Sequence, residues 1–257
     1  MLFVNSFRRS LHRFPAIYLI GAFIYHKSRN TVVRLTSIVN GYRYFSPKPS
    51  FGPYFSQFGQ DRALESLGLL VNGGVFVEVG SNHPMNNSNS YYLESKLGYS
   101  GISVDPIDYS ELYRQHRPKT EFINAAIDST RSSVILNLAK KNDGREDQVS
   151  SLHSEVIAHG RGFEVQQVEV SAVTLASVCK NLSHIDLLLL DVEGHEIDVL
   201  NSLDWDRIQP DVVLAENTGE FYPRKLLEDF MINTGYRLVA RIGSSDDIYQ
   251  LISKISK

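Results

Sequence analysis

The chain has 257 residues, 42% of them hydrophobic, which fits one large α/β domain or one domain with an extension. Its net charge of -3 is uneven, since residues 1–50 hold eight basic residues and no acid while the remainder carries -11. Cys179 is the only cysteine, which excludes a disulfide framework, and no Cys/His pattern indicates a zinc site. We therefore expect a reducing compartment, the cytoplasm, and two units: a basic, partly apolar extension (1–50) and a main domain (51–257).

The N-terminal extension contains one apolar run, FPAIYLIGAFIY, from Phe14 to Tyr25. As a helix the run would span about 18 Å, less than the roughly 30 Å hydrocarbon core of a bilayer, so a membrane-spanning helix is not expected. HKSRN follows where a signal peptide needs small residues for cleavage. Two interpretations stay open: a basic helix packed on the main domain or on a second copy of the chain, and a basic amphipathic anchor on an anionic membrane surface, peripheral to the membrane.

Strand and helix patterns alternate in the first half of the main domain. In chain order they predict a helix at 61–70, a strand at 75–80, a helix ending at Gly98, a strand at 101–106, a helix opened by a capping box of Asp108 and Glu111, and a strand at 121–127. Residues 140–163 are polar and contain glycine, so we expect an inserted loop or lid there.

The second half continues the alternation and ends differently. It predicts an additional strand at 163–170, a helix from its cap Thr174 to Asn181, a fourth main strand at 185–190, a fifth at 211–216, a helix at 223–234, and a closing antiparallel hairpin from 236–243 and 246–254. This order predicts an α/β fold with a doubly wound, mostly parallel, Rossmann-like sheet. In such sheets ligands bind outside the carboxyl ends of the strands, at the switch point of strand order.

The stretch IDLLLLDVEGHE (185–196) changes from apolar to acidic in one step. A parallel strand covered by helices on both faces must be apolar, and its carboxyl end opens at the ligand crevice. Asp191, Glu193, His195 and Glu196 are therefore the first side chains of this segment that can touch a ligand.

Two earlier strand ends carry groups suited to a nucleoside. Gly80, in VEVGSNHP, allows a sharp turn, and Ser81 and Asn82 add hydrogen-bonding groups. Asp105 ends the next strand 25 residues later, where a carboxylate can accept from both ribose hydroxyls. Asp128, after a third strand, suits either the adenine amino group or a cap on the following segment.

The glycine turn lacks the other glycines of a dinucleotide fingerprint. His83 and Pro84 stand where a second glycine would be, and proline removes one backbone donor. This disfavours a pyrophosphate, so an NAD(P)-dependent oxidoreductase is the weaker alternative. S-adenosylmethionine, a nucleoside without a pyrophosphate, suits the turn better.

Six segments, in this order, resemble the FkbM family of S-adenosylmethionine-dependent methyltransferases: SQFGQD, FVEVGSN, SNSYYLE, GYSGISVDP, NAAI and IDLLLLDVEGHE. The resemblance spans about residues 56–216, and DVEGHE is its most specific piece. It implies a seven-stranded methyltransferase fold and, in several members, acceptors that are hydroxyls on sugars or natural products. It also implies that Glu78, Gly80, Ser81 and Asn82 line the methionine end of the cofactor and that Asp105 holds its ribose.

Two positions depart from the family pattern. SNHP stands where A-N-D-G or A-N-I-G is usual, and Asp105 where glutamate is common. The first departure motivates an alternative, a catalytically inactive binding module at a membrane surface. We expect an O-methyltransferase that acts on a glycan, glycolipid or natural product.

Methyl transfer to a hydroxyl usually needs a base near the acceptor. We expect Asp191 to fill this role, with Glu193 and His195 as the next catalytic candidates, and Glu196 to cap the following helix. His153, Glu216 and Asn217 are candidates for the acceptor side. A divalent metal among Asp191, Glu193 and Glu216 is compatible with the residue types, but no spacing indicates it. We expect no nucleic-acid partner, and a homo-oligomer stays open.

Overall fold

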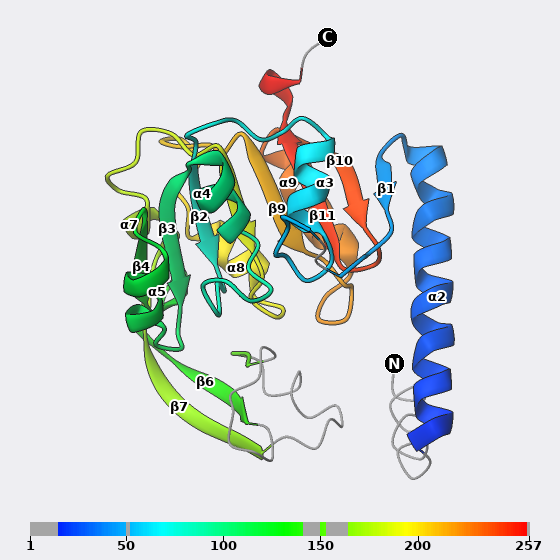
Figure 1. Ribbon diagram of the computed structural model, residues 1–257, viewed down its shortest axis with the longest axis horizontal. Coiled ribbons are helices and arrows are strands. Elements are labelled where there is room, and N and C mark those ends of the chain that lie inside the picture. Colours follow the sequence, from blue (N-terminus) through cyan, green and yellow to red (C-terminus); the bar gives the residue numbers. More distant parts are fainter. Residues whose placement is uncertain (1–14, 50–51, 141–149, 153–163, 256–257) are drawn as a thin grey trace.

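The computed structural model describes residues 15–49, 52–140, 150–152 and 164–255 (Figure 1). His153 and most of the expected lid at 140–163 lie outside the described residues.

An eight-stranded sheet lies at the centre of the fold, with the order β1-β10-β11-β9-β8-β2-β3-β4. Within this sheet the adjacent strands β9, β8, β2, β3 and β4 run parallel to one another. Strands β10 and β11 form an antiparallel hairpin, with β11 beside β9. The strands are β1 (Arg43–Phe45), β2 (Val75–Val79), β3 (Ser100–Asp105), β4 (Thr120–Asn124), β8 (Leu187–Leu190), β9 (Val212–Glu216), β10 (Tyr236–Ile242) and β11 (Asp246–Leu251). The mixed α/β class and the closing hairpin are as expected.

The expected strand number of seven is wrong for this sheet. Arg43–Phe45 pairs in parallel with β10 and adds an eighth strand at the edge. A strand of three residues is too short for an alternation to be visible in the sequence. It lies within residues 1–50, so the end of the N-terminal extension is joined to the main sheet.

Strand order reverses between β2 and β8. From β2 the chain moves outward to β3 and β4, and it then returns to place β8 and β9 on the other side of β2. Helices α3 and α4 cover one face of the sheet, and α7, α8 and α9 cover the other (Figure 1). Both faces of β8 are covered, which explains its four consecutive leucines. Leu187 and Leu189 pack on the first face, while Leu188 and Leu190 pack on the second.

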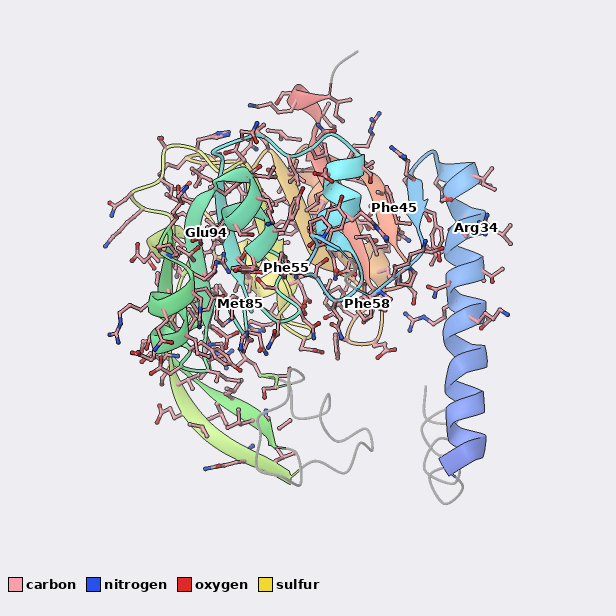
Figure 2. All side chains as sticks on the ribbon, viewed as in Figure 1. Arg34, Phe45, Phe55, Phe58, Met85 and Glu94 are labelled. Carbon is pink, nitrogen blue, oxygen red and sulfur yellow. The ribbon has the colours of Figure 1, made fainter. Side chains whose placement is uncertain are left out.

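Seven α-helices are present in the described ranges. They are α2 (Pro15–Asn40), α3 (Gln60–Ser66), α4 (Tyr91–Leu97), α5 (Ser110–His116), α7 (Leu175–Val178), α8 (Glu196–Asn201) and α9 (Arg224–Asn233), and a 3-10 turn follows β11 at Ile252–Lys254. Figure 2 shows Phe45, Phe55 and Phe58, which pack against the core on the α3 and α4 side.

Three helix ends differ from expectation. The first predicted helix stops at Ser66 instead of residue 70, just before Gly68 at φ 69°. Thr174 caps α7 as predicted, since its hydroxyl accepts from Ser177 N at 3.1 Å, but the helix ends at Val178. The capping box is wrong, because Asp108 accepts from Ser110 N while the Glu111 side chain turns to Arg114 and Gln115.

A second, three-stranded sheet has the order β5-β7-β6, from β5 (Ala126–Ile127), β6 (Ser133–Lys140) and β7 (Glu164–Val173). The predicted strand at 121–127 is therefore two strands, because the chain leaves the main sheet after Asn124 and Ala126 pairs with Ala172. The predicted additional strand is confirmed as β7, although it belongs to this smaller sheet. The antiparallel pair of β6 and β7 flanks the expected lid.

Helix α2 contacts the rest of the chain along one side. Val33 is buried, and Arg29 pairs with Glu220 at 2.9 Å. Among the side chains of α2 that the structure describes, at residues 27–40, four apolar ones are exposed: Val32, Leu35, Ile38 and Val39. Arg34 lies on the same helix (Figure 2). Within the described ranges, no helix combines the length and the apolar character that a membrane crossing requires.

Candidate active site

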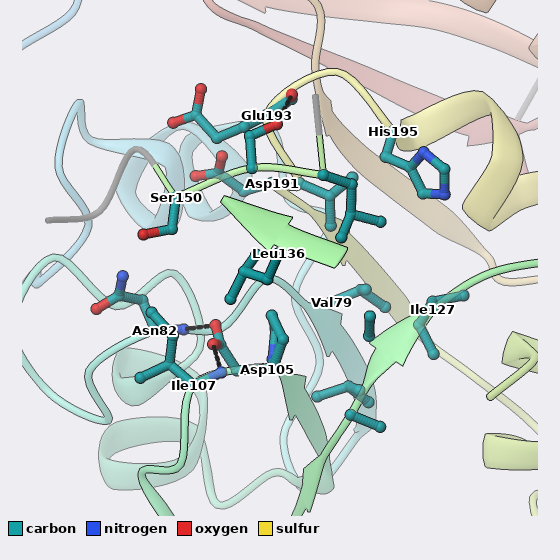
Figure 3. Close-up of a pocket in the computed structure, with 18 residues that line it drawn as sticks. Val79, Asn82, Asp105, Ile107, Ile127, Leu136, Ser150, Asp191, Glu193 and His195 are labelled. Atoms are coloured by element: carbon teal, nitrogen blue, oxygen red, sulfur yellow. Dashed lines mark hydrogen bonds between the residues drawn. The ribbon is translucent and has the colours of Figure 1, made fainter. Parts of the chain in front are cut away.

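A pocket opens at the carboxyl ends of β2, β3 and β8, next to the reversal of strand order (Figure 3). It encloses about 600 Å³, counted with its open mouth. Its polar lining includes Gly80, Asn82, Asp105, Asp191, Glu193 and His195, and its apolar lining includes Val79, Val104, Ile107, Ala126, Ile127 and Leu136. Six of the nine predicted site residues therefore share one cavity.

Gly80 has a steric reason to be glycine. Its φ is 78°, and a Cβ at this position would lie 1.8 Å from the carbonyl oxygen of Asp191. The two strand ends meet here, since Asp191 N donates to the Val79 carbonyl at 3.0 Å. The glycine turn of β2 and the acidic end of β8 can be this close only because residue 80 has no side chain.

Asp105 is held at the pocket wall by two backbone hydrogen bonds. Asn82 N donates to Oδ2 at 2.7 Å and Ile107 N donates to Oδ1 at 2.8 Å (Figure 3). Asn82 itself has the left-handed φ of 50°. The glycine turn and the end of β3 are thereby tied together through the carboxylate of Asp105.

Glu78 and Ser81 lie outside the pocket lining. Glu78 points to the same face of β2 as Phe76, away from Val77 and Val79, and its Oε2 accepts from Ser90 Oγ at 2.6 Å. Burial raises the pKa of Glu78 to about 7, against the opposing charge of Arg117. Contact of Glu78 and Ser81 with a cofactor stays a prediction.

Sequence reasoning missed Arg117, a fully buried arginine under the glycine turn. Its Nη1 donates to the Pro84 carbonyl at 2.9 Å, and its Nε pairs with Glu94 at 2.9 Å. It thus anchors the loop that contains SNHP to α4. The sequence offers no signal for this role, because a basic residue just after α5 is typical of a helix end.

Asp191 and Glu193 line the pocket from β8 (Figure 3). Burial raises the pKa of Asp191 to about 6. Glu193 has a left-handed φ of 51°, and its carbonyl accepts from Ser151 Oγ at 3.0 Å. The turn after β8 therefore contacts the segment that follows β6.

Glu196 holds this turn in shape. Its Oε1 accepts from Val192 N at 3.3 Å and from Gly194 N at 3.2 Å, while its Oε2 accepts from Tyr222 OH at 2.8 Å. Glu196 is 1% exposed, and burial raises its pKa to about 7. Glu196 therefore orients the turn before α8, and the expected cap on that helix is wrong, because the residues whose N–H groups it accepts from precede the helix.

His195 lines the pocket and lies between two carboxylates. Its Nε2 is 3.0 Å from Asp198 Oδ2 and 3.7 Å from Asp128 Oδ2. Asp128 also accepts from the backbone of Thr130 and Arg131, so it caps the segment after β5 and is not part of the pocket lining. Burial alone would raise the pKa of Asp128, but these bonds and the Arg131 guanidinium hold it well below its usual range.

Two groups of three metal-type ligand atoms lie within 4.8 Å of one another in the described ranges. One is Asp128, His195 and Asp198, and the other is His184, Asp186 and Asp211. In the first group Arg131 pairs with Asp128, with Nε at 3.0 Å from Oδ2. The set Asp191, Glu193 and Glu216 does not converge in this way.

The parallel strands of the sheet carry a pocket at the switch point, lined by a glycine turn and an acid on the next strand, which is the arrangement typical of nucleotide-binding α/β folds. Residues 78–238 match the family model described as the methyltransferase FkbM domain. The match covers most of the chain, which therefore belongs to the FkbM methyltransferase family, as the motifs predicted. No match was found among curated proteins.

Proposed function

We propose that this protein is an S-adenosylmethionine-dependent O-methyltransferase that acts on a hydroxyl of a glycan, glycolipid or natural product. The observation that carries the proposal is that Asp105 and Asp191, from strands on either side of β2, line one cavity within a domain of the FkbM family.

The pocket residues fit the cofactor chemically. Asp105 would accept from the ribose hydroxyls, and a carboxylate has about four acceptor positions for such bonds. Gly80 and Asn82 would lie at the methionine end, and Ile107 and Ala126 offer apolar contact for adenine. When bound, the cofactor supplies an electrophilic methyl group on a positively charged sulfur.

Asp191 is the best-placed base among the pocket residues. With a pKa near 6 it is mostly ionised at neutral pH, yet basic enough to accept a proton from an acceptor hydroxyl. Its backbone lies against the glycine turn, since Asp191 N donates to the Val79 carbonyl and the Asp191 carbonyl faces Gly80. Glu193 and His195 line the same pocket and would position the acceptor.

Calorimetric titration tests the cofactor. We expect saturable binding of S-adenosylmethionine and S-adenosylhomocysteine, and no comparable binding of NAD. Transfer of a radiolabelled methyl group to glycan or lipid fractions then tests the acceptor class. A folded protein that binds neither sulfur nucleoside would contradict the proposal.

We also propose that the protein works in the cytoplasm and meets anionic membrane surfaces through residues 1–50. The support is eight basic residues without an acid in that segment, and the exposed apolar side chains of α2.

A further inference from the structure

Three carboxylates form a row across adjacent strands, which we name the acidic row: Asp191, Glu216 and Asp246. Glu216 ends β9 and lies directly opposite Asp246, the first residue of β11. Leu190 of β8 pairs with Ala215 of β9, so the next residues of the two strands, Asp191 and Glu216, lie side by side. Directly paired residues project from the same face of a sheet, and here the face is the one covered by α3 and α4.

The acidic row contains buried oxygens that have no hydrogen-bond partner. Glu216 Oε2 and Asp246 Oδ2 are both in this state. Asp246 is 4% exposed, and its other oxygen accepts from Gln60 Nε2 at 3.3 Å. Buried polar atoms nearly always have partners, so two unsatisfied acceptors on neighbouring residues indicate a group that donates hydrogen bonds to both.

The surrounding charges are mostly negative. After burial, the charges that raise the pKa of Glu216 are those of Asp191, Glu193, Glu196 and Asp246. The nearby arginines are engaged by Asp247, which points to the opposite face, with Arg241 Nε at 3.0 Å and Arg224 Nη1 at 3.8 Å from its Oδ1. Burial and the charge of Asp191 raise the pKa of Asp246, and Arg224 opposes this rise only in part. A positively charged donor would therefore be stabilised in the acidic row.

The spacing of the carboxylates favours an amine over a metal ion. Mg²⁺ and Ca²⁺ bind oxygens at roughly 2.0–2.6 Å, so three ligand oxygens must lie close together. The oxygens of the acidic row do not converge within 4.8 Å of one another. A protonated primary amine instead carries three N–H donors that point in different directions and can reach separated acceptors.

We propose that the acidic row binds a protonated amino group on the methyl acceptor, so that the substrate is an amine-bearing alcohol such as an amino sugar. This inference rests on the proposed function, because Asp191 belongs both to the acidic row and to the pocket where the hydroxyl would react. The amino group would then set which hydroxyl faces Asp191.

The test compares D-glucosamine with D-glucose in calorimetric titrations at pH 7, on the full chain with and without S-adenosylhomocysteine. We expect glucosamine to bind at least about ten-fold more tightly than glucose. Glu216→Gln and Asp246→Asn should each remove most of this preference, since they keep the side-chain shape but lose the charge. Glu111→Gln, at an exposed acid on α5, is the matched control and should keep the preference.

Four outcomes would overturn the inference. They are equal affinity for the two sugars, an unchanged preference in folded Glu216→Gln and Asp246→Asn, tight Mg²⁺ binding that displaces glucosamine, and variants that weaken S-adenosylhomocysteine but not glucosamine. Thermal melting checks that the variants fold. Failure of the methyltransferase proposal is separate, because it shows as absence of S-adenosylhomocysteine binding to the wild-type chain.

Discussion

At the scale of single residues, Asp191 belongs both to the pocket lining and to the acidic row, so our proposals place it where cofactor and acceptor would meet. It lines the pocket and its backbone contacts the glycine turn. Burial and, after it, the charge of Asp191 raise the pKa of Glu216 and of Asp246. The position of Asp191 at the pocket could be predicted from the sequence, because the carboxyl end of a buried parallel strand opens at the crevice of the sheet. The neighbouring carboxylates from β9 and β11 come from segments about 25 and 55 residues later, so strand order had to be known before they could be grouped with Asp191.

Asp191→Asn keeps the shape of the side chain and removes its charge. We expect methyl transfer to fall by roughly 10²–10⁴, the usual effect of losing an acid-base group. Wild-type transfer should decline as the pH falls through about 6, because the base must be ionised. Burial raises the pKa of Asp191 above its ordinary 3.8, so ionisation opposes folding above that pH, and the Asn variant should be at least as stable at pH 7.

Glu196→Gln is the matched control for Asp191→Asn. Glutamine retains an oxygen that can accept from Val192 N and Gly194 N, and its amide can donate to Tyr222 OH. We expect a loss of transfer of less than about ten-fold. If Asp191→Asn were folded and fully active, the base would have to lie elsewhere, with Glu193 as the next candidate.

Asp105→Ala should weaken binding of S-adenosylmethionine by about 1.5–3 kcal/mol, the range for hydrogen bonds to a charged group. Part of the effect would come from Asn82 N and Ile107 N, which lose their acceptor. Calorimetry measures the affinity, and a melting curve separates it from unfolding. Unchanged affinity in a folded variant would remove Asp105 from the cofactor site.

At the scale of elements, the strands with a long apolar run or a clear alternation could be predicted from the sequence. Short strands and strands with an obscured alternation could not. β2, β8 and the closing hairpin follow directly from their patterns. β6 was missed because Val134, Ile135 and Leu136 are consecutive apolar residues, which hides the alternation of buried Val134 and Leu136 with exposed Ile135. The sequence left two roles open for Asp128, because capping and ligand contact need the same residue type, and the structure shows its hydrogen bonds to the segment after β5.

Gly80→Ala tests how closely the ends of β2 and β8 must approach. The added Cβ would overlap the Asp191 carbonyl and would sit at an unfavourable φ, so we expect the free energy of unfolding to fall by about 3 kcal/mol or more. Gly68→Ala is the control, because φ is 69° there but no atom lies within 4 Å of the added Cβ. It should cost about 1–2 kcal/mol. Urea titrations measure both, and equal losses would mean that the contact at Gly80 relaxes easily.

At the scale of the whole molecule, the basic segment and the acidic remainder of the sequence correspond to two different parts of the structure. The acids gather in the main domain, including the acidic row, while α2 presents four exposed apolar side chains near basic ones. The charge pattern of the sequence predicts an N-terminal extension and a main domain, with the boundary between them at residue 50. Pairing of Arg43–Phe45 with β10 shows that the sheet begins earlier, which changes where the chain should be shortened.

A chain that begins at Gly41 should keep the main fold, because it retains β1 and its pairing with β10. We expect the full chain to sediment with vesicles that contain phosphatidylserine and the shortened chain to remain in solution. Each basic residue near an anionic surface contributes about 1 kcal/mol, so replacing Arg8, Arg9 and Arg13 by Glu should weaken binding by more than about 100-fold. Raising the salt concentration should weaken it as well.

The matched control for this charge reversal is replacement of Arg114, Lys180 and Lys225 by Glu, three exposed basic residues of the main domain. Both triple variants change the net charge by the same amount, so a general attraction of the chain to anionic vesicles would be weakened equally in the two. An effect confined to the N-terminal variant would locate the contact in residues 1–50. A full chain that ignores the vesicles at low salt would leave α2 with a structural role, since Arg29 and the buried Val33 already join it to the main domain. In that case the shortened chain should melt at a clearly lower temperature than the full one.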